Sequence, residues 1–359
     1  MKDNVVKSGR SLVHMACAIV FLIFTFCYLY FYQADILSVE QHLLSGGKTY
    51  YVPWIGALLI TFVLYLIHLG TYGLTGLYKR AHALTYFPSL LILTILTGMK
   101  ISDAGCTMGH WLFTGPLLLV VYVFVVIMLK KYQPYEQPMN DIGPFSRMMW
   151  VNLLTMALMF LLVGAFSNRD ALFHSRMRVE TLLKNGEYEK ALEVGRRARR
   201  TDASLFQLRA YALARTNGLG SHLFEYPTVS GSKALLPRQG TSSTVMYPEV
   251  EIRRFASTKA ADDYRLCAYL LDKDLLSFAK SVYKCYDIKS ADFPKHYREA
   301  LTLYTHKSNT PVVTYHNSVA DADYEDFQKL ARSVSDKQQR ENAVRDTYGN
   351  TYWFYYFFR

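Results

Sequence analysis

Residues 12–32, with the sequence LVHMACAIVFLIFTFCYLYFY, contain no Asp, Glu, Lys or Arg. A helix needs about 20 apolar residues to cross the ~30 Å hydrocarbon core of a bilayer. This stretch therefore predicts a membrane-spanning helix. It is longer than the apolar part of a signal peptide, and no small-residue cleavage motif follows it before Asp35, so we expect it to be retained.

Four later stretches have the same character, and the complete set of predicted spans is about 12–32, 52–72, 83–99, 111–129 and 148–167. The third span is the shortest and contains Pro88, which leaves a re-entrant loop as its alternative. Residues 1–166 hold only 10 of the 40 Lys+Arg and 6 of the 29 Asp+Glu, which excludes a single globular domain. The sequence therefore predicts an all-α fold in which a five-span transmembrane helical bundle, residues 1–168, precedes a soluble α-helical domain.

Lysine and arginine in the short connections predict the orientation of the bundle. The N-terminal segment and the second and fourth connections hold eight of these residues, whereas the opposite connections hold two, Lys48 and Lys100. The positive-inside rule then predicts a multi-pass protein of the inner (cytoplasmic) membrane, with a cytoplasmic N-terminus and an extracytoplasmic (periplasmic) C-terminal domain. No predicted span contains Asp, Glu, Lys or Arg, which argues against ion-coupled transport, and we interpret His14 and His68 as packing residues.

Helical periodicity continues after the last span. We expect helical hairpins at 169–226, a linker at 227–259 and a C-terminal helical domain with an aromatic tail at 260–359. The hairpin with its second helix at 187–200 resembles a tetratricopeptide repeat, in which small residues and an aromatic recur at the spacing of two closely packed helices, here Gly186, Tyr188, Ala191 and Ala198. This resemblance implies a repeat-like α-helical hairpin domain with a binding surface.

The chain as a whole resembles a family of multi-spanning bacterial membrane proteins of unknown function. The resemblance rests on four strings: AHALTYFP (81–88), FSRMMW (145–150), PKHYREA (294–300) and YGNTYW (348–353). It covers both halves of the chain and supports the two-part architecture. It implies no activity and no functional residue.

The sequence contains no recognisable catalytic or cofactor-binding motif. Phosphate-binding glycine loops, Cys-x-x-Cys, His-Glu-x-x-His and Gly-x-Ser-x-Gly are absent, so we predict no catalytic residue, no cofactor and no metal site. Asp103, Cys106 and His110 form either a metal or thiol site or an incidental polar loop. Cys267 and Cys285 either pair outside the cytoplasm or remain buried thiols.

Two groups of residues are predicted to bind a partner or the membrane. One is a basic patch, which is either a solvated helix face or a site for anionic headgroups or an acidic partner. The other belongs to a run of seven aromatics that must be buried in the end of the helical array, in the membrane interface or in a partner. The residues are Arg196, Arg197, Arg199, Arg200, Tyr352, Trp353, Tyr355 and Tyr356.

These patterns predict a membrane-anchored helical-repeat protein that acts as a non-catalytic protein–protein interaction or scaffold module at the bacterial cell envelope. Its expected partners are the lipid bilayer and a protein or peptide. Nucleic acid is not expected, because no nucleic-acid-binding module accompanies the basic patch. The alternative function is an envelope enzyme or transporter accessory that acts on lipid or glycan through its outer loops.

Overall fold

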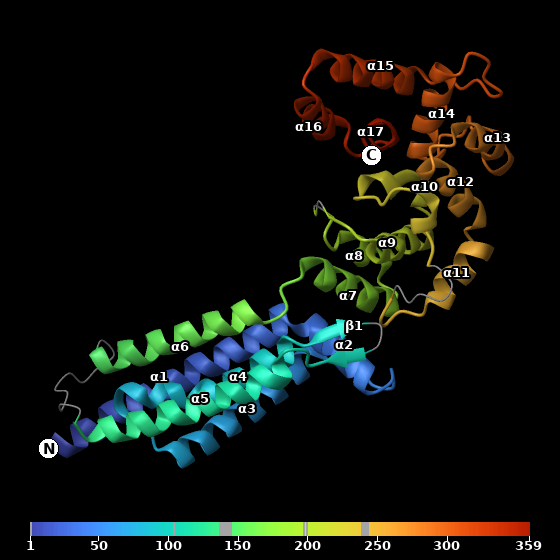
Figure 1. Ribbon diagram of the computed structural model, residues 1–359. Coiled ribbons are helices and arrows are strands. Elements are labelled where there is room, and N and C mark those ends of the chain that lie inside the picture. Colours follow the sequence, from blue (N-terminus) through green and yellow to red (C-terminus); the bar gives the residue numbers. More distant parts are fainter. Residues whose placement is uncertain (1, 103–104, 136–145, 197, 199, 238–243) are drawn as a thin grey trace. The chain divides into compact units, whose positions relative to one another are not determined.

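The computed structural model describes residues 2–102, 105–135, 146–196, 198, 200–237 and 244–359 (Figure 1). The chain folds into two compact units, Met1–Asp170 and Ala171–Arg359. The described secondary structure is helical apart from one antiparallel hairpin, formed by β1 (Lys100–Ser102) and β2 (Gly105–Thr107). The predicted all-α class is therefore confirmed.

Long apolar helices make up most of the first unit. Its helical segments are α1 (Lys2–Cys27), η1 (Tyr28–Tyr32), α2 (Ala34–Leu44), α3 (Pro53–Thr75), η2 (Lys79–Tyr86), α4 (Phe87–Thr97), α5 (Trp111–Tyr132), η3 (Gln133–Tyr135) and α6 (Arg147–Phe166). Within the described residues, four helices are long and apolar enough to cross a membrane, by length and composition: Leu12–Tyr32, Pro53–Thr75, Trp111–Tyr135 and Arg147–Phe166.

The prediction of a fifth helix of spanning length, at 83–99, is wrong. The segment divides into the 3₁₀ helix η2 and the α-helix α4, which has only 11 residues. Proline has no N–H to donate and is best accommodated in the first turn of an α-helix, although α5 holds Pro116 in its interior. Pro88 occupies that first turn, so α4 begins at Phe87 and the residues before it adopt a different helical geometry.

Buried hydrogen bonds hold η2 and α4 against the neighbouring long helices. The fully buried Asn152 of α6 accepts from Ala83 N (2.7 Å) and donates to Lys79 O (2.8 Å). At the other end of α6, Asn168 N donates to Thr97 O (2.9 Å). The segment 79–97 therefore runs alongside α6 in the same direction, from Asn152 to the C-terminal end of that helix.

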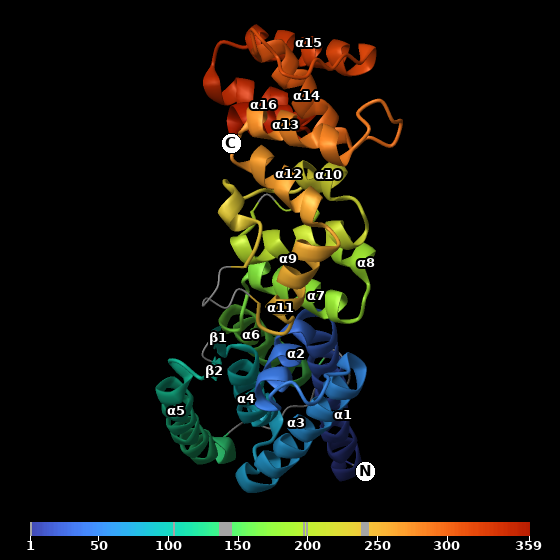
Figure 2. The same ribbon diagram turned by 90° about the vertical axis from the view of Figure 1, so that its right-hand side faces the viewer.

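The second unit is built from shorter helices (Figure 2). These are α7 (Ala171–Lys184), α8 (Tyr188–Glu193), α9 (Ala203–Arg215), α10 (Leu219–His222), η4 (Leu223–Glu225), η5 (Ser232–Ala234), α11 (Glu249–Thr258), α12 (Ala261–Leu271), α13 (Leu275–Cys285), α14 (Lys295–Lys307), α15 (Ser318–Ser333), α16 (Lys337–Tyr348) and α17 (Tyr352–Phe358). These helices enclose two clusters of buried hydrophobic side chains, of which the larger extends to the C-terminal helices. The C-terminal helix α17 packs against α14 and α16. The predicted aromatic tail thus enters the core of this unit.

Two segments of the second unit differ from expectation. The helix expected over 187–200 ends at Glu193, because Gly195 adopts a left-handed conformation (φ +61°) and the buried Arg209 donates to the carbonyl oxygens of Val194 and Gly195. The region 227–259, expected as a linker, contains α11. It is fastened by the buried Glu180, whose carboxylate accepts from the backbone N–H groups of residues 245, 246 and 247.

Candidate functional site

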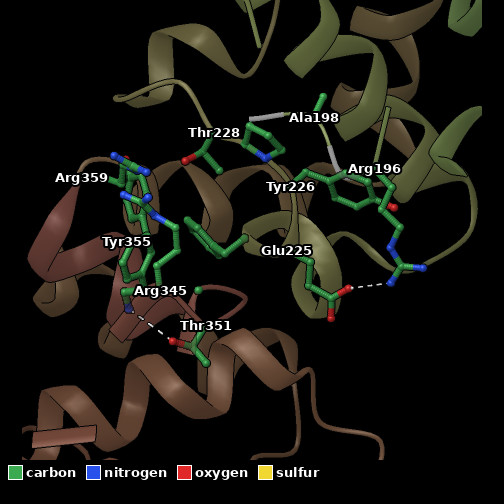
Figure 3. A pocket seen from close by; sticks show the side chains of 13 residues that line it. Arg196, Ala198, Glu225, Tyr226, Thr228, Arg345, Thr351, Tyr355 and Arg359 are labelled. Atoms are coloured by element: carbon green, nitrogen blue, oxygen red, sulfur yellow. Dashed lines mark hydrogen bonds and ion pairs between the residues drawn. The ribbon is translucent and has the colours of Figure 1, made fainter. Parts of the chain in front are cut away.

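A cavity of about 250 Å³ lies in the second unit, between the chain segment around η4 and the C-terminal helices α16 and α17 (Figure 3). Its lining combines arginines with aromatic side chains and backbone turns. The lining residues are Arg196, Ala198, Phe224, Glu225, Tyr226, Pro227, Thr228, Arg345, Gly349, Thr351, Phe354, Tyr355 and Arg359.

One wall of this arginine pocket is the aromatic tail. The Thr351 side chain caps α17 by accepting from Phe354 N (3.3 Å), as a residue at a helix N-cap does. Tyr352 and Tyr355 bury their rings and donate their hydroxyls to the carbonyl oxygens of residues 270 (3.2 Å) and 271 (2.7 Å). Each buried hydroxyl therefore has a partner, and the tail is fixed in one orientation.

A buried histidine–glutamate pair on α14 connects the two walls. Phe224, in η4 on the side opposite the aromatic tail, donates its backbone N–H to His296 Nε2 (3.2 Å). The imidazole proton must then lie on Nδ1, which is 3.0 Å from Glu299 Oε2. The same Glu299 oxygen accepts from Tyr352 N (2.7 Å), and the Glu299 carbonyl accepts from Trp353 Nε1 (2.8 Å). His296 and Glu299 thus link Phe224 to Tyr352 and Trp353 through hydrogen bonds without lining the pocket.

Two arginines and one ring form the charged part of the tail wall. The Arg345 and Arg359 guanidinium carbons lie 5.8 Å and 5.5 Å from the centroid of the Phe354 ring, within the range of cation–π contacts. Both arginines contact the single carboxylate of Glu341. Arg345 Nε is buried and has no hydrogen-bond partner among the described residues. This wall therefore has donor capacity that its own carboxylate does not use.

The opposite wall carries one further arginine. Arg196 Nη2 lies 3.5 Å from Glu225 Oε2, and Figure 3 shows this pair across the cavity from Arg345 and Arg359. Glu225 is shared, because its other oxygen lies 3.1 Å from His222 Nδ1 and 3.8 Å from Lys295 Nζ.

Positive charge exceeds negative charge in this pocket. The lining contains three arginines and one glutamate, and Glu341 behind the tail wall supplies one further carboxylate. Guanidinium groups bind carboxylates and phosphates through paired hydrogen bonds, and aromatic walls accept an apolar body. The arrangement is therefore suited to hold an anionic group that carries an apolar or aromatic portion.

Two parts of the chain, residues 105–252 and 251–359, match a family of unknown function, DUF6057. The chain belongs to this family. No curated protein and no solved structure matches the chain. Every residue that lines the arginine pocket lies within the regions matched to DUF6057. The predicted resemblance to a family of unknown function is thereby confirmed.

The structure brings two of the predicted binding residues of this DUF6057 member together, because Arg196 and Tyr355 both line the pocket. Arg200 is exposed away from it, and Arg197 and Arg199 lie outside the described residues. Tyr352 and Trp353 are buried in the core, and the half-buried Tyr356 ring lies beneath Lys307 (4.6 Å). The pocket residues that sequence analysis missed include Glu225, Arg345 and Arg359. The three-residue spacing of His296 and Glu299 could have predicted that these two side chains lie on one face of a helix and form a hydrogen bond.

The candidate metal or thiol site at Asp103, Cys106 and His110 is described only in part. Asp103 lies outside the described residues, and Cys106 Sγ contacts Met99 Sδ (3.4 Å). Cys267 and Cys285 are both free thiols in the structure; Cys267 is buried and Cys285 is half-buried. Within the described residues, no group of three or more His, Cys, Asp or Glu is arranged to hold a metal ion.

Three histidines nevertheless meet inside the first unit. The His14 ring stacks on His82 with centroids 3.8 Å apart, and His68 stacks on Tyr86 at 3.6 Å. His68 Nδ1 also lies 3.2 Å from Thr85 Oγ1. These are the contacts of packing residues, and His82 is a member of the group that the sequence did not indicate.

Proposed function

We propose that this DUF6057 protein is a non-catalytic, membrane-anchored binding protein of the bacterial cell envelope. In this proposal the second unit captures a protein or peptide partner through an acidic segment. The arginine pocket carries the proposal, because its excess of guanidinium groups and its aromatic walls complement a carboxylate beside an apolar residue.

Anchoring in a membrane is supported by the surfaces of the long helices. Phe62 on α3, Val120 on α5 and Leu154 on α6 are among many large apolar side chains exposed on the first unit. A water-soluble protein rarely exposes contiguous apolar surface of this extent. Lipid tails would cover these side chains without cost.

The proposed topology treats residues 79–97 as a fifth, composite crossing. With a rise of ~2.0 Å per residue in η2 and ~1.5 Å in α4, the segment has a contour of about 32 Å. Its bonds to α6 lie about 24 Å apart along that helix, so it covers most of the ~30 Å hydrocarbon core. Its ends are bonded to Asn152 and Asn168, near opposite ends of the membrane-length helix α6. Five crossings and the positive-inside rule then give a cytoplasmic N-terminus and a periplasmic second unit, in the inner membrane.

The repeat-like character of the second unit is also part of the proposal. Consecutive helices α7, α8 and α9 contact one another, and α12 contacts α13. Such packing of neighbours along the chain is typical of helical hairpins that present a binding surface. A peptide bound in the arginine pocket would contact the two C-terminal helices of this unit, α16 and α17.

The test uses the full-length protein in detergent and labelled peptides that carry two acidic residues beside an aromatic residue, measured by fluorescence anisotropy. Peptides with Asn and Gln in place of Asp and Glu should bind about tenfold more weakly, because a charge-assisted hydrogen bond contributes ~1.5–3 kcal/mol. Arg196→Gln should weaken the acidic peptide by a similar factor. Arg254→Gln is the matched control, since Arg254 is also exposed and also pairs with one glutamate, Glu251. Equal binding of acidic and amide peptides would refute this function.

A further inference from the structure

A second cavity, of about 390 Å³, lies in the first unit where α2 and the following loop meet the beginning of α3. Its lining is apolar on one side and polar on the other. The lining residues are Leu37, Glu40, Gln41, Leu44, Ser45, Thr49, Tyr51 and Ile60. None of them is Lys, Arg or His, so no lining side chain can balance a negative charge.

Glu40 is the unusual residue of this cavity. Its side chain lies on the buried face of α2 together with Ile36 and Leu37, and the residue is only 4% exposed. Glu40 Oε1 has no hydrogen-bond partner among the described residues. A buried carboxylate oxygen without a partner is costly, because burial removes its hydration and no hydrogen bond replaces it. Such a group is retained at the edge of a membrane when a ligand or a proton uses it.

The other polar groups at the cavity are acceptors or weak acids. The amide nitrogen of Gln41 is already committed to Thr49 Oγ1 (3.1 Å) and Tyr50 O (3.4 Å), which leaves the amide oxygen as the group that can bind. Tyr51 Oη is buried without a hydrogen-bond partner among the described residues. Burial, together with the nearby Glu40 carboxylate, raises the pKa of Tyr51 to about 12. The site thus selects for a ligand that donates hydrogen bonds and carries positive charge.

We propose that this cavity binds the primary ammonium headgroup of a membrane lipid, with Glu40 as the counter-charge and Tyr51 and Gln41 as further hydrogen-bond partners. The apolar lining indicates a lipid rather than a soluble amine. Ile60 lies about 10 Å along α3 from its first residue, within a helix of spanning length, so the cavity continues onto the surface that faces hydrocarbon. This inference rests on the proposed membrane insertion of the first unit and is independent of the arginine pocket.

Protonation of Glu40 is consistent with this role. Burial raises the pKa of Glu40 to about 8, so the carboxyl is mostly protonated at neutral pH before the headgroup binds. An ammonium ion that enters the cavity favours the ionised carboxylate, and the carboxyl proton leaves to solvent. Cys106 on β2 is a further titratable group within the field of Glu40, because the carboxylate contributes to the raised pKa of that thiol.

The experiment measures lipid retention by the full-length protein. The protein is reconstituted in nanodiscs that contain equal amounts of phosphatidylethanolamine and phosphatidylcholine with the same acyl chains, released into mild detergent, and analysed by native mass spectrometry. Recovery of folded protein in the discs tests insertion separately from lipid selectivity. We expect retention of phosphatidylethanolamine over phosphatidylcholine by about fivefold, or ~1 kcal/mol.

Three variants then test the assignment. Glu40→Gln keeps the size and neutrality of the protonated side chain and should reduce the preference to about one. Tyr51→Phe should reduce it by about half, and Asp35→Asn, which removes a carboxylate from the same helix outside the lining, should leave it unchanged. The proposal is overturned if wild type shows no preference while inserted, or if Glu40→Gln retains it. Displacement of the lipid by millimolar free ethanolamine would overturn the choice of a lipid.

Discussion

Replacement of Tyr352 by alanine tests whether the aromatic tail is part of the core. The Tyr352 ring is fully buried, packs against Phe224 (centroids 5.1 Å apart), and its hydroxyl donates to the Leu270 carbonyl oxygen. Truncation of a buried aromatic to alanine costs ~3–5 kcal/mol, of which the hydroxyl bond accounts for ~1 kcal/mol. We therefore expect Tyr352→Ala to lower the free energy of unfolding by about 4 kcal/mol and Tyr352→Phe by about 1 kcal/mol.

The assay is urea unfolding of a fragment that contains residues 171–359, one of the two compact units. Trp353 is the only tryptophan in that fragment, so its fluorescence reports on the tail directly. We expect the fragment to be helical by circular dichroism and to unfold cooperatively. With a slope of ~2 kcal/mol per molar urea, Tyr352→Ala should shift the midpoint by about 2 M.

The matched control is Phe357→Ala, which removes an aromatic from the same helix where 49% of the residue is exposed. It should cost less than ~1 kcal/mol, because little area leaves a buried environment. If Tyr352→Ala and Phe357→Ala shift the midpoint equally, the tail is not packed in the core of the second unit. A fragment that unfolds without cooperativity would contradict the independence of the second unit.

Three further outcomes are expected. Glu180→Gln should destabilise the same fragment by ~2–3 kcal/mol, because the amide cannot accept from all three backbone N–H groups; an unchanged urea midpoint would show that the 244–247 segment is held otherwise. The raised pKa of Glu40, about 8 against an ordinary 4.5, stabilises the folded protein fully below pH 4.5, and this contribution is lost as pH rises through about 8. In nanodiscs of phosphatidylcholine alone, which offer no primary ammonium headgroup, the melting temperature of the protein should therefore fall relative to Glu40→Gln between pH 5 and 8, and parallel profiles would contradict it. An alkaline phosphatase fused after Arg359 should be active, since that enzyme works only outside the cytoplasm; an inactive but expressed fusion would indicate four crossings.

The spacing of apolar residues was sufficient to predict the helices that bury one apolar face. The C-terminal domain expected at 260–359 is helical in the structure: α12, α13 and α14 each bury several apolar side chains on one face, whereas α16 buries only Val344. Asp274 and Asp336 cap two of them by accepting from a backbone N–H. Local patterns of this kind are visible in the sequence.

The features that sequence analysis missed depend on residues far apart in the chain. Glu180 is an acidic residue on the buried face of α7. Its hydrogen-bond partners are backbone N–H groups 65 to 67 residues later in the chain, and no rule of local sequence spacing predicts such a contact. The arginine pocket joins Arg196 to Arg359, and its geometry depends on the buried bonds of His296 and Glu299. Apolar composition alone also could not distinguish one long helix from η2 followed by α4, because that difference comes from the position of Pro88.

The bonds of Asn152 have a consequence for the order in which the protein is made. Ala83 N and Lys79 O find their partner in a side chain that the ribosome adds about 70 residues later. Until α6 emerges, η2 has exposed backbone polar groups that hydrocarbon disfavours strongly. If residues 79–97 cross the membrane as proposed, they would wait beside the translocation channel during synthesis and enter the bilayer together with α6. Chains truncated before Arg147 should leave this segment accessible to water-soluble thiol reagents at an introduced cysteine, whereas chains extended beyond Asn168 should protect it.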